Sequence, residues 1–199
     1  MTLPRLLLLT DRRQLPPGRG LCDQIEYAVR AGVRAVVLRE RDLSPDRRTL
    51  LAGEIAAVLA PVGGVLIAAS PGLPSADGVH LRSTDGLPRT RPQVLGRSCH
   101  SRDDIDRAGD EHVDYVVVGP VALTASKPGY GPALGRTGLR RMLRGHAGPP
   151  VYALGGVTAD NASTWLDAGA DGLAVMGELM RAEDPFALAA RLLDHVGSR

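Results

Sequence analysis

AGVRAVVLR at residues 31–39 and AGADGLAVMG at residues 168–177 share one local pattern. In each stretch an amphipathic segment ends at a glycine, Gly32 or Gly169, and a short turn leads into an apolar run. Glycine is favoured just beyond a helix because it adopts left-handed backbone angles without a steric clash. An apolar run without polar alternation is typical of a strand that is buried on both faces. The pattern therefore predicts helix–turn–strand units around a parallel sheet.

Eight apolar runs of this kind recur along the chain, and amphipathic segments separate most of them. The runs are RLLLLTD from residue 5, AVVLRE from 35, GVLIAAS from 64, GVHLR from 78, VLGRSCH from 94, DYVVVGPV from 114, PVYALGGV from 150 and GLAVMGEL from 172. Helices are expected over residues 23–31, 45–60, 102–111, 137–144, 160–168 and 185–196.

Eight strands linked by crossovers within 199 residues predict an α/β fold, a compact single (β/α)8 TIM barrel that spans residues 1–199 as one domain. The helices after the third and fourth strands are expected to be degenerate. Only residues 71–77 separate those two strands, and Pro88 and Pro92 interrupt the next crossover. A doubly wound open sheet is the alternative, but no glycine-rich nucleotide-binding turn follows the first strand.

The composition is that of a globular protein with a mildly basic charge. The chain has 44% hydrophobic but only 3% aromatic residues, so aliphatic side chains must form most of its core. Its net charge is +2, and its arginines are scattered without an aromatic platform, so we expect no nucleic-acid partner. Two cysteines without disulfide or zinc spacing favour a reducing, cytoplasmic location. Since no apolar run approaches about 18 residues, no membrane association is expected.

The carboxyl ends of the predicted strands carry polar residues, and a barrel enzyme builds its site from these ends. Alternation along the second strand places Arg39 and Arg41 on one face and Glu40 on the other. Guanidinium groups pair well with phosphate and carboxylate oxygens. Arginines in these positions therefore indicate an anionic small-molecule substrate.

The fifth strand ends in Ser98, Cys99 and His100. Ser98 and His100 share one face while Cys99 points away, so a Cys99–His100 nucleophilic dyad is not expected. Histidine titrates near neutral pH, which makes His100 a candidate acid/base residue, and a purely structural role is the alternative. His80 in the fourth strand is the weaker candidate for the same role.

Glycine turns follow the seventh and eighth strands. They are Gly155–Gly156 in ALGGVTADN and Met176–Gly177 in AVMGEL. Backbone N–H groups at such turns can approach a phosphate closely, and phosphate sites after strands seven and eight recur in barrels. The turns therefore predict a phosphate site, with tight strand-to-helix connections as the alternative.

Six segments, in order and spanning nearly the whole chain, resemble the thiamine phosphate synthase and thiazole tautomerase superfamily. They are VVLRERD, ADGVHLRSTD, GRSCHS, DYVVVGPVALTASK, YALGGVTADN and AGADGLAVMG. The resemblance implies a (β/α)8 barrel that binds a small phosphorylated thiazole. It also makes a homodimer an expectation.

The synthase branch joins a pyrimidine pyrophosphate to thiazole phosphate with the help of Mg²⁺. The resemblance places its metal ligands where this chain has Ala68 and Ala69, after the third strand, and Asp85, after the fourth. Alanine offers Mg²⁺ no side-chain ligand, so only Asp85 keeps a metal-binding group. Half of the metal site is therefore missing.

The longest loop, TASKPGYGPALG at residues 124–135, follows the sixth strand and contains the only lysine of the chain. Its glycines and prolines predict a mobile lid, with a plain surface loop as the alternative. Thr124, Ser126 and Lys127 resemble the segment with which the synthase branch grips pyrophosphate.

The tautomerase branch of the superfamily needs no metal. It moves a proton to aromatise a carboxylated thiazole phosphate, and its acid/base histidine matches His100. We therefore predict a metal-free thiazole tautomerase of the TenI-like branch, without a cofactor, in which His100 and Arg39 are catalytic. The predicted substrate and phosphate ligands are Arg41, Ser98, Thr124, Ser126, Lys127, Gly155, Gly156, Met176 and Gly177.

Two alternatives stay open at this point. The first is a divergent Mg²⁺-dependent thiamine phosphate synthase that joins hydroxymethylpyrimidine pyrophosphate and thiazole phosphate, with Asp85 as a metal ligand. The second is a non-catalytic regulator that only binds thiazole phosphate.

Overall fold

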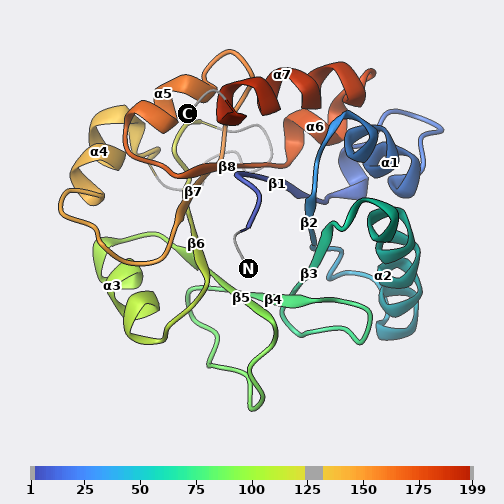
Figure 1. Cartoon of the computed structure of the whole chain (residues 1–199), viewed down its shortest axis with the longest axis horizontal. Helices are drawn as coiled ribbons and strands as arrows, with labels where there is room; N and C mark the ends of the chain where they lie inside the picture. Colours follow the sequence, from blue (N-terminus) through green and yellow to red (C-terminus); the bar gives the residue numbers. More distant parts are fainter. Residues whose placement is uncertain (1–2, 124–131, 198–199) are drawn as a thin grey trace.

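Eight parallel strands close into a barrel in the computed structural model, which describes residues 3–123 and 132–197 (Figure 1). The strands are β1 (Leu6–Leu9), β2 (Ala35–Leu38), β3 (Val65–Ala69), β4 (Gly78–Leu81), β5 (Val94–Cys99), β6 (Tyr115–Val118), β7 (Val151–Leu154) and β8 (Gly172–Val175). Neighbours in sequence are neighbours in the barrel, and β8 pairs with β1 to close it. The predicted TIM barrel is confirmed, because none of the eight strands lies at the edge of an open sheet.

Helices cover most of the barrel wall. They are α1 (Leu21–Ala31), α2 (Pro45–Leu59), α3 (Arg102–Asp110), α4 (Gly135–Met142), α5 (Ala162–Asp167), α6 (Gly177–Arg181) and α7 (Pro185–Gly197), with the 3₁₀ turns η1 (Arg12–Gln14) and η2 (Ala60–Val62). Residues 70–77 and 82–93, all of them described, form no helix, which confirms the degenerate crossovers after β3 and β4. Figure 1 shows the barrel wall beside β4 and β5 without a helical cover. The short helix α6 was not expected from the sequence.

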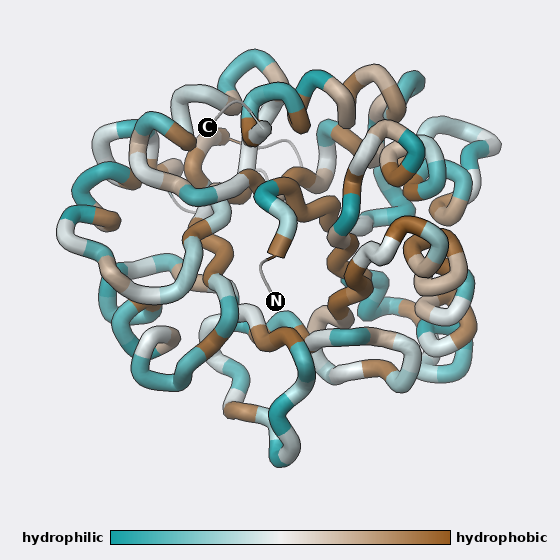
Figure 2. Tube along the Cα trace, in the orientation of Figure 1, coloured by the Kyte–Doolittle hydropathy of each residue, from teal (hydrophilic) through white to brown (hydrophobic). Residues whose placement is uncertain are grey.

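Side chains along each strand alternate between two apolar cores. Figure 2 shows the hydrophobic stretches of the chain in brown. Inward-facing side chains such as Leu7 and Val37 fill the barrel, and outward-facing ones such as Leu6 and Val36 pack beneath the helices. Burying one aliphatic side chain of this size stabilises the fold by roughly 1.5–3 kcal/mol. Alternation on short strands therefore holds the barrel together although aromatic residues are scarce.

Two tyrosines complete the inner core, and a glycine makes room for one of them. Tyr115 lies opposite Gly96 in the β5–β6 pairing, and a Cβ atom at Gly96 would overlap the Tyr115 ring. Tyr115 also meets Tyr152 edge-on, with ring centroids 5.6 Å apart. Gly96 is thus required for Tyr115 to lie inside the barrel, where its hydroxyl reaches the functional site.

The two glycines of the repeated sequence pattern end their helical segments as predicted. Gly32 has a φ of +123° and Gly169 a φ of +110°, angles that side-chain-bearing residues rarely adopt. The Gly32 N–H donates to the Val29 carbonyl at 3.0 Å, which satisfies one of the last carbonyls of α1.

Among the helices that the structure describes, none combines the length and apolar character needed to cross a membrane.

Candidate active site

A cavity of about 460 Å³ opens where the strands end, and its wall is rich in arginine. The described residues contribute four arginines to the wall but a single carboxylate, that of Glu178. The arginines are Arg39, Arg41, Arg82 and Arg181. A hollow with this excess of positive charge attracts anions.

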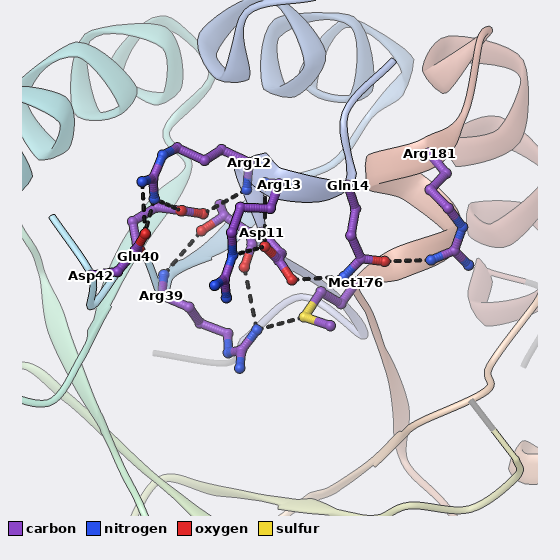
Figure 3. Close-up of polar contacts among 10 residues, drawn as sticks. Asp11, Arg12, Arg13, Gln14, Arg39, Glu40, Asp42, Met176 and Arg181 are labelled. Atoms are coloured by element: carbon purple, nitrogen blue, oxygen red, sulfur yellow. Dashed lines mark hydrogen bonds and ion pairs between the residues drawn. The ribbon is translucent and has the colours of Figure 1, made fainter. Parts of the chain in front are cut away.

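Arg39 follows β2 and points into the cavity, where neutral groups hold it (Figure 3). Its backbone N–H donates to Thr10 Oγ1 at 2.9 Å. Its Nη1 lies 2.6 Å from Met176 Sδ and 3.4 Å from the Thr10 carbonyl oxygen. Within the described part of the chain it forms no salt bridge. These partners orient the guanidinium and leave its charge available to a ligand.

The carboxylates next to Arg39 in sequence are turned outward and paired with Arg12 (Figure 3). Arg12 Nη1 lies 2.7 Å from Glu40 Oε2, and Arg12 Nη2 lies 2.7 Å from Asp42 Oδ2. The hydrogen bond from Arg12 lowers the pKa of Asp42 to about 2. Because Arg12 engages both acids outside the cavity, neither neutralises Arg39.

Arg181 ends α6 at another part of the wall and also has a neutral partner. Its Nη1 donates to the side-chain oxygen of Gln14 in η1 (Figure 3). Gln14 Nε2 in turn donates to Asp11 Oδ2 at 2.7 Å. The amide of Gln14 therefore separates the Asp11 carboxylate from Arg181.

Arg41 and Arg82 lie near each other beside the ends of β2 and β4. Burial lowers the pKa of Arg41, and the nearby charges of Arg82 and Arg39 lower it further. Among the cavity arginines, and within residues 3–123 and 132–197, Arg82 alone forms a salt bridge: its Nε donates to Asp85 Oδ1 at 2.9 Å. The Arg82 backbone N–H donates to Asp85 Oδ2, also at 2.9 Å.

His80 lies at the inner end of the cavity in a hydrogen-bonded row of side chains. Its Nδ1 is 2.9 Å from the Tyr115 hydroxyl, and its Nε2 is 2.9 Å from Ser98 Oγ. Burial lowers the pKa of His80 to about 3, with smaller contributions from Arg41, Arg39 and Arg97. His80 is therefore a neutral imidazole at physiological pH.

The sequence carries one signal for this hydrogen-bonded row, the position of His80 in β4. Alternation along β4 turns His80 toward the barrel interior, where a polar ring needs partners. Those partners lie 18 and 35 residues further along the chain, at Ser98 and Tyr115, so only the closed barrel identifies them.

The structure places Ser98 and His100 on the cavity wall and buries Cys99 on the other face, as alternation predicted. His100 Nδ1 lies 2.7 Å from the Gly119 carbonyl oxygen, which can only accept, so Nδ1 carries the proton. The His100 backbone N–H donates to Asp104 Oδ2 at 2.9 Å. Burial raises the pKa of Cys99 to about 12, which makes it unreactive.

The two glycine turns after β7 and β8 meet at the cavity, which Gly155, Gly156, Met176 and Gly177 all line. Gly155 and Gly156 have φ angles of +93° and +67°. Asn161 fixes this turn by donating from Nδ2 to the Gly156 carbonyl at 2.8 Å. Thr124, Ser126 and Lys127 lie outside the described residues, so their predicted role stays a prediction.

Known proteins of similar sequence decide the family. The sequence profile described as thiamine monophosphate synthase matches residues 6–179. The chain belongs to the thiamine monophosphate synthase family. It is 39% identical to a thiamine-phosphate synthase of Albidiferax ferrireducens over 94% of this chain and 90% of that protein. It is 36% identical to one of Thermus thermophilus over 98% of both chains.

A solved structure agrees with the fold of this family. Thiamine phosphate pyrophosphorylase from Pyrococcus furiosus superposes with a TM-score of 0.83, at 24% identity, over 98% of this chain and 96% of that one. At this identity the likeness shows the barrel fold alone.

The thiazole tautomerase prediction is wrong. The chain is an enzyme of a family whose similar members are named thiamine-phosphate synthases. The prediction gave decisive weight to the missing side chains of Ala68 and Ala69. Those alanines offer no side-chain ligand to a metal, but the cavity still contains arginines and glycine turns that can bind anions. The absence of metal-binding side chains at these two positions was therefore not sufficient evidence for a different reaction.

The residues at the ends of β3 and β4 do not fit a divalent cation. Ala69 lines the cavity where the resemblance expects a carboxylate, and both oxygens of Asp85 accept hydrogen bonds from Arg82. No group of three or more His, Cys, Asp or Glu side chains suited to a metal occurs in the described residues. Residues 124–131 add none, because TASKPGYG contains no such residue.

Proposed function

We propose that the chain is a transferase, a thiamine-phosphate synthase that joins hydroxymethylpyrimidine pyrophosphate to a thiazole phosphate. The observation that carries this proposal is the 36–39% identity to proteins of that name over at least nine tenths of the chain. The arginine-rich cavity supports it, since both substrates are anions and a guanidinium binds phosphate oxygens through two hydrogen bonds.

In this reaction the protein must stabilise pyrophosphate as it leaves. The lone pair of the thiazole nitrogen forms a bond to the methylene carbon of the pyrimidine. The bond between that carbon and the diphosphate oxygen breaks, and the oxygen keeps the electron pair. The thiazole becomes a thiazolium cation, and pyrophosphate leaves with one more negative charge. Fixed positive groups that face this charge lower the barrier because they are already oriented.

The wall of the cavity offers separate groups to the two substrates. Arg39 and Arg41 supply unneutralised charge beside β2 for the diphosphate. The turn at Gly155–Gly156, on the opposite part of the barrel, presents backbone groups for the phosphate of the thiazole. Ser98, fixed by His80, offers a hydroxyl between them.

His100 has no proton to transfer in this reaction, because the carbon–nitrogen bond forms without proton loss. Its ring N–H is held by the Gly119 carbonyl, which keeps the imidazole against the cavity wall. We assign His100 a binding role rather than the proton transfer that a tautomerase requires.

Incubating the purified chain with both substrates tests the proposed function. We expect thiamine phosphate and pyrophosphate in equal amounts, measured by chromatography and by a pyrophosphate assay. Arg39→Ala should lower kcat/KM at least 100-fold, while Arg30→Ala, which removes an exposed arginine from the last turn of α1, should leave it unchanged. Absence of both products with folded protein would overturn the proposal.

A further inference from the structure

A buried guanidinium lies behind the end of β3, where the resemblance places a metal. Arg48 on α2 is 4% exposed, and its Nη1 donates to the Pro71 carbonyl at 3.1 Å while its Nη2 contacts the Ala69 carbonyl. Burial lowers the pKa of Arg48, and no carboxylate of residues 3–123 or 132–197 forms a salt bridge with it. A fixed positive charge in such surroundings repels a metal ion and attracts an anion.

Two more guanidinium groups flank the same place from the neighbouring strands. Arg41 follows β2 and, within the part of the chain that the structure describes, forms no salt bridge, although the charge of Asp85 acts on it from a distance. Arg82 follows β4, and its side chain is 63% exposed, so it can turn toward a ligand while Asp85 holds its Nε. Arg41 and Arg82 thus lie at the ends of β2 and β4, with Arg48 behind the end of β3. The carboxylates nearby are already paired, Asp85 with Arg82 and both Glu40 and Asp42 with Arg12.

The loop that carries Arg82 is also fixed from beneath. Arg97 on β5 is fully buried, and its Nη1 donates to the carbonyls of Arg82 at 2.9 Å and of Asp85 at 2.8 Å. Arg97 Nε lies 2.7 Å from Glu111 Oε2. The Arg82–Asp85 turn is therefore held in place before any ligand arrives, which reduces the entropy lost on binding.

We propose that Arg41 and Arg82, backed by Arg48, bind the diphosphate of the pyrimidine substrate directly, with no divalent cation between protein and diphosphate. The identity of this ligand rests on the proposed synthase function. Guanidinium groups take over the neutralisation of the departing pyrophosphate. Asp85 is then a positioning residue that orients Arg82, and it is not a metal ligand.

Calorimetric titration of the full chain with inorganic pyrophosphate in EDTA tests this site. We expect saturable binding in EDTA and weaker apparent binding when Mg²⁺ is added, because the metal competes with the arginines for the same oxygens. Binding that is absent in EDTA and appears only with Mg²⁺ would overturn the proposal.

Three site variants and one control variant test which residues bind the pyrophosphate. Arg41→Ala and Arg82→Ala should each weaken pyrophosphate binding in EDTA at least tenfold, while Arg30→Ala should change it less than twofold. Asp85→Asn should bind pyrophosphate in EDTA about as tightly as the unsubstituted chain, since the amide oxygen can still accept a hydrogen bond that orients Arg82 while one negative charge leaves the site. A tenfold loss in Asp85→Asn, seen only in Mg²⁺, would instead identify a metal ligand and contradict the proposal.

The synthase assay, run in EDTA and in Mg²⁺, separates this inference from the proposed function. Equal product formation in both buffers supports both the synthase function and the metal-free diphosphate site. Product that strictly requires Mg²⁺ upholds the synthase function and overturns the metal-free site. Arginine-dependent pyrophosphate binding in EDTA without product in either buffer upholds the site and overturns the function.

Discussion

His80 Nε2 lies 2.9 Å from Ser98 Oγ, and this contact fixes which way the serine hydroxyl can donate. The buried Tyr115 hydroxyl has His80 Nδ1 as its partner in the described residues. A buried hydroxyl needs an acceptor for its proton, so Tyr115 donates to Nδ1. A neutral imidazole that accepts at Nδ1 carries its proton at Nε2 and donates it to Ser98. The Ser98 hydroxyl is then free to donate into the cavity.

Tyr115→Phe should disturb this row without changing the shape of the core. We expect kcat/KM to fall about tenfold, or ~1.4 kcal/mol of transition-state stabilisation, because Ser98 loses its fixed orientation. The ¹⁵N NMR signals of His80 should shift from the Nε2–H form toward a mixture of tautomers. Tyr27→Phe, at an exposed tyrosine, is the matched control and should change neither. An unchanged His80 spectrum in Tyr115→Phe would contradict the assignment.

The buried neutral His80 should make the fold sensitive to acid. Its pKa falls from the ordinary 6.5 to about 3 on folding, so between these values the unfolded chain binds a proton that the folded chain does not. The free energy of unfolding should therefore decrease as the pH is lowered from 6.5 toward 3, by up to about 1.4 kcal/mol per pH unit from this group. Urea titrations at pH 7, 6, 5 and 4 should show a shallower decrease for His80→Gln. Parallel pH profiles for the two proteins would rule out this origin.

Gly156→Ala should damage both the fold and the proposed phosphate site. A Cβ there would overlap the Leu123 carbonyl oxygen, and the φ of +67° is unfavourable for alanine. We expect about 3 kcal/mol less stability in urea unfolding, combining roughly 1–2 kcal/mol of backbone strain with the clash. Gly18→Ala isolates the strain, since Gly18 has a φ of +78° and no atom lies within 4 Å of the place where an alanine methyl would sit. Equal losses in the two variants would show that the close approach is unimportant.

Arg97→Met should loosen the turn that carries Arg82. The substitution leaves Glu111 without its ion-pair partner and removes the donors to the carbonyls of residues 82 and 85. We expect a loss of about 3 kcal/mol in the free energy of unfolding, as for other broken buried pairs, together with weaker pyrophosphate binding. Glu111→Gln keeps the donors of Arg97 in place, so it should retain most of the pyrophosphate affinity. A loss of affinity in Glu111→Gln as large as in Arg97→Met would contradict the role of the turn.

The local sequence determined the elements of the barrel and the direction of their side chains. Gly32 and Gly169 mark the ends of helical segments because their backbone angles exclude most other residues. Period-two alternation put Arg39 and Arg41 on the cavity side and Glu40 on the other, and the structure has them there. These predictions held because capping and alternation depend on neighbours within a few residues.

Closure of the barrel determined which charged side chains pair with each other, and the local sequence does not determine these pairs. Arg12 forms salt bridges with Glu40 and Asp42, and Arg82 forms one with Asp85. Arg48, on the separate helix α2, contacts the carbonyl of Ala69. Such pairings join residues on different elements, and charge balance in a cavity depends on all of them at once. The family resemblance of the sequence therefore indicated where metal ligands are missing, while only the tertiary structure showed which charged partners Arg12, Arg48 and Arg82 have.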